Sequence, residues 1–527
     1  MKVKLQVLCL LVFFVALLTA CGRDSTADIE SPNYGMSIRW GYGYGWTGVE
    51  ELPPDTEIVG RIGSTFGVSI VPELIQGGHN ENNPPNIFAT ASNPHDLLQY
   101  GVTRTIPMDM IARYAPNYYN LLMPVPFGLD VFKDGRSDLI GLPIYTGSVE
   151  ELGHYSVYRL DWLERYNIFI PGNIVPIKEG QIYFTDTPFT YDQFVEIMRA
   201  FSESASQYGF AIVRRYGQLQ NLSALKGMWG LGNGIVNDNG RPNYYFADPR
   251  YKEFLQFMAY MYGNGIFTSP IQRGAEAWQY ENIRLGFFHT MQTGWFQSHF
   301  AGILADTSNV AWVFRQWPDA RLLVTPPEVG PFGDSGVGVQ SVLRFSPFGM
   351  WVIGSQTSDE ELAAILEIFN YVAFDRYAYV MANFGLEGEH FEWEGMPFGS
   401  RAIRSADFMA AYNSGVHVLS THMSVFMGDA MYFGDNTLTR HSTSDAGRRA
   451  VILPYREDIH GDFALHYAEL TEHYGEELMR IREEFFLLAI RGQIDIDEEW
   501  QSYIDELNEN GLQQFLALVE QFPVVGR

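Results

Sequence analysis

Aromatic side chains alternate with glycine at the end of one predicted strand. Residues 36–40 have the pattern of a strand and lead into Gly41-Tyr42-Gly43-Tyr44-Gly45-Trp46. Alternating glycines could cradle a phosphate, but the spacing is not G-x-G-x-x-G and no helix with the right pattern follows. Ligands of open α/β sheets lie beyond the carboxyl ends of the strands. Tyr42, Tyr44 and Trp46 are therefore candidate ligand contacts, and packing within the loop is the competing interpretation.

Other aromatic residues are candidates for the same chemistry. Tyr145 ends the apolar run 139–145, and Trp295 follows the strand predicted at 283–292. Trp229, Trp278 and Trp351 are further candidates. Aromatic faces stack on the apolar C–H faces of a sugar, whose hydroxyls need paired hydrogen bonds from polar side chains. The set is compatible with a neutral ligand held by stacking and hydrogen bonds, although packing in the core would also explain each residue.

Four charged or polar residues could supply the polar part of such a site. Arg159 and Asp161 open the helix predicted at 159–166, where they could hold a ligand or form an ion pair that caps the helix. Glu387 and His390 lie in the loop 383–391, where a structural role is again the alternative.

No pattern in the chain predicts a metal site or a catalytic centre. His417, His422 and His441 lie in a polar region, but without H-E-x-x-H or another zinc spacing. Residues 333–336, Gly-Asp-Ser-Gly, echo the nucleophile segment of trypsin-like proteases, but the chain lacks the matching Ala-His-Cys segment. Acidic residues are too numerous for a glycosidase carboxylate pair to stand out. We expect no enzyme activity, cofactor or metal, and a secreted carbohydrate-active enzyme is the alternative.

The charge balance argues against several classes of partner. The chain has 527 residues and a formal net charge of −27, which becomes −29 without residues 1–20, because these carry Lys2 and Lys4 and no acid. A nucleic-acid-binding face must neutralise phosphates with Lys and Arg, so no nucleic-acid partner is expected. Aromatic residues make up 15% of the chain, which suits a neutral ligand held by stacking.

The N-terminus has the pattern of an export signal. A basic start is followed by the apolar run Leu5–Leu18, which is too short to span a bilayer comfortably. The run ends in Leu18-Thr19-Ala20-Cys21, which resembles the lipobox of bacterial lipoproteins. That resemblance implies cleavage before Cys21 and lipidation of its thiol, with an ordinary signal peptide as the alternative. Cys9 would be removed, so no disulfide is expected.

Strand and helix patterns alternate along most of the chain, which indicates an α/β fold. Thr190 with Gln193, and Ser358 with Glu361, have the spacing of capping boxes at the starts of helices 191–204 and 358–374. Further helices are predicted at 55–66, 250–263, 467–490 and 497–522. The last two would pack on the second half of the molecule.

Several segments together resemble the extracellular solute-binding proteins, family 1, of bacterial ABC importers, in particular a large Paenibacillus-type lipoprotein subgroup. Tyr158-Arg159-Leu160-Asp161-Trp162-Leu163 is similar to its R-x-D-W-L segment, and residues 383–391, NFGLEGEHF, are similar to N-Y-G-x-E-G-x-H-Y. Residues 100–117, 262–266 and 490–492 resemble further family segments. Residues 91–96, ASNPHD, depart from the family's A-S-G-D-x-P-D, so this loop could differ in ligand specificity.

The resemblance implies an α/β, two-lobe periplasmic-binding-protein-like fold of type II, with lobes joined by two or three crossing segments. Crossings are expected near 143–155, 288–294 and 354. The expected division is a signal peptide at 1–20, a lipidated tether at 21–34, a first lobe at 35–145 plus 290–353, and a second lobe at 146–289 plus 354–527.

The resemblance also implies a function. A monomer, held at the extracytoplasmic face of the cell membrane by its N-terminal lipid, would capture a carbohydrate, in particular an oligosaccharide, in the cleft between the lobes. It would then deliver this ligand to the permease subunits of an ABC importer. A binding protein that feeds a sensor kinase is a further alternative.

Overall fold

The structure is a computed structural model, which describes most of residues 33–520. The residues it does not describe are 1–32, 43–50, 76–82, 91–93, 124–131, 135–136, 146–153, 206–212, 216–217, 220–221, 232–234, 239–240, 269–270, 273–286, 293–311, 337–344, 406, 422, 424, 427–429, 435–437, 439, 441–473 and 521–527. No helix in the described part is both long and apolar enough to cross a bilayer.

The first lobe is built on a sheet with the strand order β2-β1-β3-β16-β4, in which β5 also pairs with β16. β1 runs parallel to β2 and β3, whereas β16 is antiparallel to β3, β4 and β5. The strands are β1 (Met36–Tyr42), β2 (Val68–Leu74), β3 (Ile87–Thr90), β4 (Thr103–Arg104), β5 (Leu142–Tyr145) and β16 (Phe345–Gly354).

Helices from two distant parts of the chain share one core with this sheet. Trp40 of β1 and Trp351 of β16 meet at its centre, with ring centroids 5.8 Å apart. The elements of this lobe besides the sheet are α2 (Glu57–Thr65), α3 (Pro94–Gln99), α4 (Met108–Tyr114), α5 (Pro116–Leu122), α13 (Asp359–Phe374), α14 (Arg376–Phe384), α15 (Phe408–Asn413), α16 (Ala430–Phe433) and the hairpin of β17 (Phe391–Trp393) and β18 (Ala402–Arg404).

The second lobe is built on a sheet with the strand order β14-β6-β15-β8-β7. β6 is antiparallel to β14 and β15, and β15 is parallel to β8. The strands are β6 (His154–Arg159), β7 (Val175–Lys178), β8 (Ile182–Phe184), β14 (Phe287–Gln292) and β15 (Leu322–Thr325). Two smaller sheets comprise β9 (Val213–Arg215), β10 (Gln218–Leu219) and β13 (Ile271–Gln272), and β11 (Ile235–Asp238) with β12 (Arg241–Tyr244).

The C-terminal helices complete the core of the second lobe, as predicted. Phe485 stacks on Tyr503 with ring centroids 4.1 Å apart, and the Tyr503 hydroxyl donates to the Phe246 carbonyl. The helix predicted at 497–522 is two helices, because Gly511 has a φ of +102°. The helices of this lobe are α6 (Leu160–Arg165), α7 (Tyr191–Ala205), α8 (Ser223–Gly227), η3 (Tyr245–Ala247), α9 (Pro249–Gly263), α12 (Trp312–Gln316), α20 (Glu476–Ile490), α21 (Ile496–Glu509) and α22 (Leu512–Val519).

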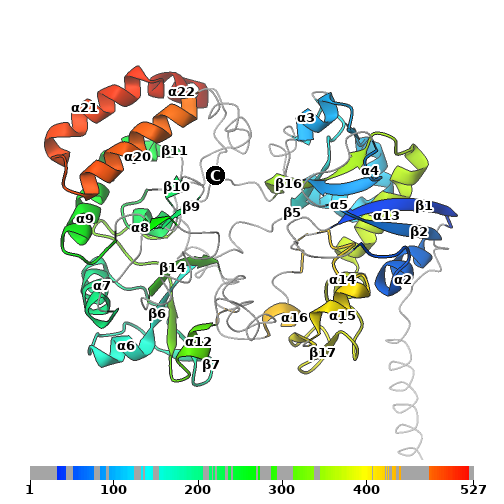
Figure 1. Ribbon diagram of the computed structural model, residues 1–527, viewed down its shortest axis with the longest axis horizontal. Coiled ribbons are helices and arrows are strands. Elements are labelled where there is room, and N and C mark those ends of the chain that lie inside the picture. Colours follow the sequence, from blue (N-terminus) through cyan, green and yellow to red (C-terminus); the bar gives the residue numbers. More distant parts are fainter. Residues whose placement is uncertain are drawn as a thin grey trace, which may run out of the picture.

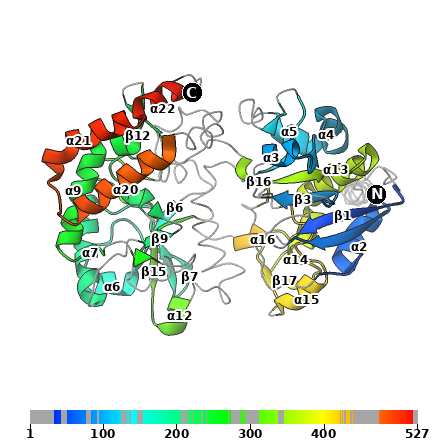
Figure 2. The same cartoon turned by 45° about the horizontal axis from the view of Figure 1, so that its top comes forward.

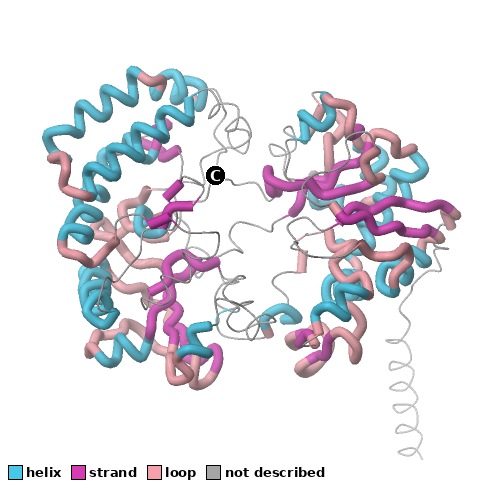
Figure 3. Tube along the Cα trace, in the orientation of Figure 1, coloured by secondary structure: helices cyan, strands magenta, loops and turns pink. Residues whose placement is uncertain are grey.

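The two lobes lie side by side (Figure 1), and each gathers its own group of strands (Figure 3). The chain passes from the first sheet to the second between Tyr145 and His154, and returns before Phe345. It passes again after α16, which lies on the side of the first lobe that faces the second (Figure 2). Tyr432 packs with α14 of the first lobe, whereas Leu438 is buried against the second sheet.

This topology corrects the predicted lobe boundaries. Within the range 290–353, β15 hydrogen-bonds to β6 and β8 and so belongs to the second lobe. Within 354–527, α13 and residues up to Met423 pack in the core of the first lobe. The crossings expected near 288–294 and 354 are displaced for the same reason, because β14 stays in the second sheet and the chain crosses before β16. Strand patterns do not say which sheet a strand joins.

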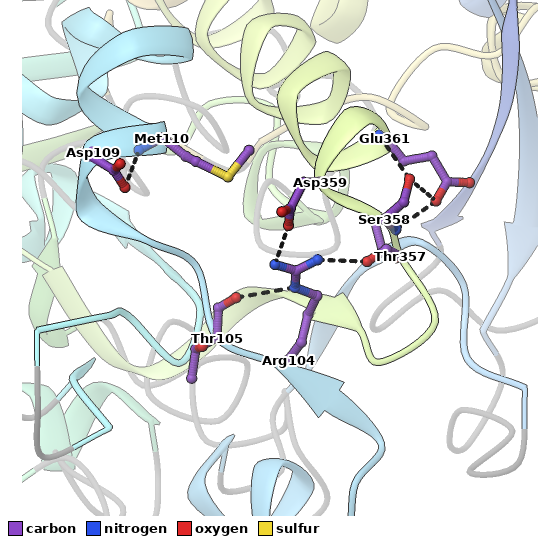
Figure 4. A network of polar contacts seen from close by, with 8 residues as sticks. All are labelled: Arg104, Thr105, Asp109, Met110, Thr357, Ser358, Asp359 and Glu361. Atoms are coloured by element: carbon purple, nitrogen blue, oxygen red, sulfur yellow. Dashed lines mark hydrogen bonds and ion pairs between the residues drawn. The ribbon is translucent and has the colours of Figure 1, made fainter.

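A polar network ties α13 to the edge of the first sheet at which β16 ends (Figure 4). Arg104 donates to the Thr357 carbonyl at 2.7 Å and to Asp359 Oδ1 at 2.6 Å. Ser358 and Glu361 form the predicted capping box. Glu361 also accepts a hydrogen bond from the Asn86 side chain at 3.2 Å, so one carboxylate joins the start of α13 to the start of β3.

We expect Glu361→Ala to lower the free energy of unfolding by about 1–2 kcal/mol, because it removes the capping box and the bond to Asn86. Chemical denaturation of the purified chain measures this. Glu360→Ala is the matched control, since Glu360 is an exposed acid in the same first turn. Equal losses in the two variants would show that only the helix dipole is affected.

Candidate functional site

In each sheet, most strands have their carboxyl ends at the edge where the chain crosses between the lobes, whereas β16 in the first sheet and β6 and β7 in the second run the other way. In the first sheet, Thr90 at the end of β3 is opposite Met350, and Tyr145 at the end of β5 is opposite Phe345 near the start of β16. In the second sheet, Gln292 at the end of β14 is opposite His154, where β6 enters. Since ligands of α/β sheets bind at carboxyl edges, these facing edges are the candidate site.

Tyr145 is the predicted contact that the structure places at a crossing. It is the last residue of β5, its side chain is half-buried, and it packs against the core of the first lobe. Its backbone N–H donates to the sulfur of Met423 at 3.1 Å. A half-buried ring at this position keeps a surface that a ligand between the lobes could reach.

Tyr42 and Trp351 lie near the same edge, but their rings are packed in the core. Tyr42 is 5% exposed, and its hydroxyl accepts a hydrogen bond from the Leu52 N–H at 3.1 Å. Trp351 is 1% exposed, and its Nε1 donates to the Thr421 carbonyl at 2.9 Å. The competing interpretation, core packing, therefore describes both residues, and neither ring presents a face for stacking.

Trp229 belongs to the core of the second lobe. It is 2% exposed, and its ring contacts Tyr191, Phe254 and Phe257 at centroid distances of 5.8, 5.5 and 4.8 Å. Three aromatic neighbours occupy the surface that a ligand would need. This prediction is corrected to a packing role.

Arg159 and Asp161 lie at the edge of the second sheet that is remote from the crossings. Arg159 ends β6 opposite Leu322, the first residue of β15. Its Nε and Nη2 donate to the two oxygens of Asp161 at 2.8 and 2.6 Å, and Asp161 also accepts from the Arg321 N–H at 3.2 Å. The guanidinium lies over the rings of Trp162 and Trp317. The pair fixes α6 against β15, so the ligand-binding prediction is corrected.

The His390 side chain is buried and makes hydrogen bonds that hold its turn in place. Its Nδ1 accepts from the Leu386 N–H at 3.0 Å, so the neutral ring carries its proton on Nε2, which lies 3.1 Å from Ser414 Oγ. Gly385 has a φ of +94°, and a Cβ there would lie 2.5 Å from His390 Nδ1, so only glycine fits. Glu387 of the same turn is exposed. The family-like segment thus has a structural explanation, which corrects the prediction for His390.

The remaining predicted residues lie outside the described residues. These are Cys21, Tyr44, Trp46, Trp278 and Trp295. They stay predictions. In the described part of the chain, no group of three His, Cys, Asp or Glu side chains is arranged to hold a metal ion.

The facing edge of the second sheet carries buried polar residues that the sequence analysis missed. Ser156 of β6 is opposite Thr325, the last residue of β15, and both are fully buried. The Tyr158 hydroxyl donates to Glu328, which follows β15. Burial, and then the Glu328 carboxylate, raise the pKa of the Tyr158 phenol, so it remains a donor. The sequence feature that could have drawn attention to this pair is the acidic residue Glu328, which comes directly after Pro326-Pro327, the pair that follows β15.

The Gly-Asp-Ser-Gly segment at 333–336 is a turn packed beside α8. Ser335 Oγ donates to the Pro327 carbonyl at 2.8 Å, and the Gly330 N–H donates to the Asp334 carbonyl at 2.8 Å. A Cβ at Gly330 would lie 1.6 Å from the Met228 carbonyl oxygen. The Ser335 hydroxyl therefore stabilises the turn through this hydrogen bond.

No protein-family model matches the chain, and no curated protein matches it. Solved structures do. The HMO-binding, ABC-transporter-associated solute-binding protein of Bifidobacterium longum infantis has a TM-score of 0.61 at 12% identity, over 93% of this chain and 98% of that one. FusA of Streptococcus pneumoniae in complex with kestose has a TM-score of 0.59 at 16% identity, over 92% and 98%. The alginate-binding protein AlgQ2 has a TM-score of 0.55 at 15% identity, over 92% and 97%.

These similarities extend over nearly the whole of each chain, and at such low identity they establish the fold. The chain has the mixed α/β, two-lobe fold of periplasmic solute-binding proteins. The fold class expected from the sequence is confirmed. These three solved structures are those of binding proteins.

We expect Arg159→Met to destabilise the second lobe by about 3 kcal/mol, because it leaves Asp161 without its bidentate partner in a largely buried setting. Thermal and chemical unfolding measure the loss. Arg480→Met is the control, since Arg480 is exposed and pairs with Glu477 and Glu484 on the surface of α20, and its melting temperature should stay close to wild type. A stable Arg159→Met variant with weakened ligand binding would restore the ligand-contact prediction.

Proposed function

We propose that this protein is an extracytoplasmic solute-binding protein of a bacterial ABC importer and that it captures a carbohydrate between its lobes. The observation that carries the proposal is that both sheets have a carboxyl edge at the crossings, with the half-buried Tyr145 at the edge of the first sheet. The resemblance of segments such as 158–163 and 383–391 to family 1 solute-binding proteins supports the same class. Within that family, we propose that the protein belongs to the Paenibacillus-type lipoprotein subgroup.

Three features support a neutral or weakly charged carbohydrate as the ligand. The net charge of −27 disfavours anionic partners, and 15% aromatic residues provide stacking surfaces. Proteins of the same fold are described as HMO-binding or were solved with kestose. An oligosaccharide, which can reach both edges at once, is the form of ligand that we favour.

Closure of the lobes on the ligand would create the surface that a permease recognises, so we propose delivery to ABC permease subunits by a monomer. Feeding a sensor kinase would use the same closure. Neighbouring permease genes without an ATPase beside them would favour import, whereas a sensor kinase alone would favour signalling.

The direct test is calorimetry of the body lacking residues 1–21 against a panel of glycans. We expect saturable binding with the glycan unchanged, and a roughly ten-fold loss of affinity in Tyr145→Ala, about 1.4 kcal/mol, because one stacking surface is removed. Tyr260→Ala, at an exposed position of α9, is the control and should bind as wild type does.

Product formation from a glycan would overturn the proposal in favour of a carbohydrate-active enzyme. Absence of binding to every neutral and acidic glycan would show that the ligand is not a carbohydrate. Trp46→Ala and Trp295→Ala extend the same measurement to predicted contacts outside the described residues, and normal binding by both would discard those two assignments.

We also propose that Cys21 carries the lipid anchor at the extracytoplasmic face of the membrane. Two or three acyl chains hold a protein stably at a bilayer. In a bacterial host, Cys21→Ser should move the protein from the membrane fraction to the soluble extracytoplasmic fraction, as fractionation with immunoblotting would detect. Retention of the variant in the membrane fraction, with the apolar segment still attached, would instead indicate an uncleaved anchor.

A further inference from the structure

One segment of the first lobe is hydrogen-bonded to five other elements, and its last residue contacts Tyr145. We name residues 414–421 and 423, which follow α15, the bridging segment. It is buried along most of its length. Its hydrogen bonds run to α2, α14, β16, β5 and the β17–β18 region.

The first part of the bridging segment is held in a close and strained conformation. The Ser414 carbonyl accepts from the Ile58 N–H at 2.8 Å, and Ser414 Oγ lies 3.1 Å from His390 Nε2. A Cβ at Gly415, where φ is +90°, would lie 2.7 Å from Thr56 Oγ1. His417 has a φ of +74°, which costs a non-glycine residue about 1 kcal/mol or more, so the surroundings must impose it.

Arg404 of β18 helps to impose that conformation. Its Nη1 lies 3.2 Å from His417 Nε2, and its Nη2 donates to the Asn383 carbonyl at 2.8 Å. In the described part of the chain no carboxylate pairs with it, whereas Arg401 on the same hairpin pairs with Glu394 at 3.1 Å. The Arg404 guanidinium is therefore directed at the bridging segment and at the end of α14.

The last part of the bridging segment reaches the interlobe edge. The Thr421 carbonyl accepts from Trp351, and the Met423 carbonyl accepts from the Tyr379 hydroxyl at 3.2 Å. Met423 is 2% exposed, and its sulfur accepts from the Tyr145 N–H at 3.1 Å. Sulfur is a weak acceptor, but no bulk water competes at such a buried atom. The chain of ties thus ends on the backbone of the residue at which the chain leaves the first lobe.

We propose that the bridging segment is a positioning element for ligand binding, and that Met423 acts by fixing the backbone from which the Tyr145 ring projects. The proposal rests on the proposed function, because it requires Tyr145 to contact the ligand. Met423 itself is a positioning residue and does not touch the ligand. His390, Arg404 and Tyr379 support it through the earlier ties.

The test is a double-mutant cycle on glycan affinity. Met423→Leu keeps the volume of the side chain and removes the acceptor, so we expect a three- to five-fold weaker affinity with little change in melting temperature. Met258→Leu makes the same replacement in the fully buried core of the second lobe and should leave affinity unchanged. In the Tyr145→Ala background, Met423→Leu should cause no further loss.

The outcomes separate this inference from the proposed function. If the wild-type protein binds glycans and Met423→Leu binds equally well, the inference is wrong and the function stands. An undiminished effect of Met423→Leu in the Tyr145→Ala background would also overturn it, because the segment would then act elsewhere. If the wild-type protein binds no glycan, the proposed function fails and takes the inference with it.

Discussion

The insertion of β16 into the first sheet is the interaction on which the arrangement of the molecule depends. β16 pairs with β3, β4 and β5, although the whole second sheet lies between β5 and β16 in the chain. Its antiparallel register with β5 requires the chain to return at the edge where it left. Closing so long a loop costs entropy, which the burial of Met350, Trp351, Val352 and Ile353 helps to offset.

That return also determines where the candidate site lies. The chain enters the second sheet at His154, which is opposite the last residue of β14. The carboxyl edge of the second sheet therefore lies at the same crossings. Two sheets that present carboxyl edges to the same crossings define the candidate site between the lobes. One buried polar pair near this edge is Tyr158 with Glu328, in which the carboxylate accepts from the phenol.

Several residues with the chemistry of a site proved to be structural ties, for one physical reason. A buried charge or imidazole needs a hydrogen-bond partner, which explains the pairing of Arg159 with Asp161 and of His390 with Ser414. Large rings such as Trp229 and Trp351 stabilise the fold best when wholly buried, which removes their faces from any ligand. Tyr145 differs because its strand ends at the crossing, where the core also ends.

The sequence by itself determined the features that depend on neighbours in the chain. The capping residues Ser358 and Thr190, the helices that they start, and the α/β class follow from spacing within a few residues. Lobe membership and exposure do not. That β15 joins the second sheet, that α13 covers the first, and that His390 faces Ser414 were decided only by the tertiary structure. Strand partners and burial depend on residues far away in the chain, and no local pattern records them.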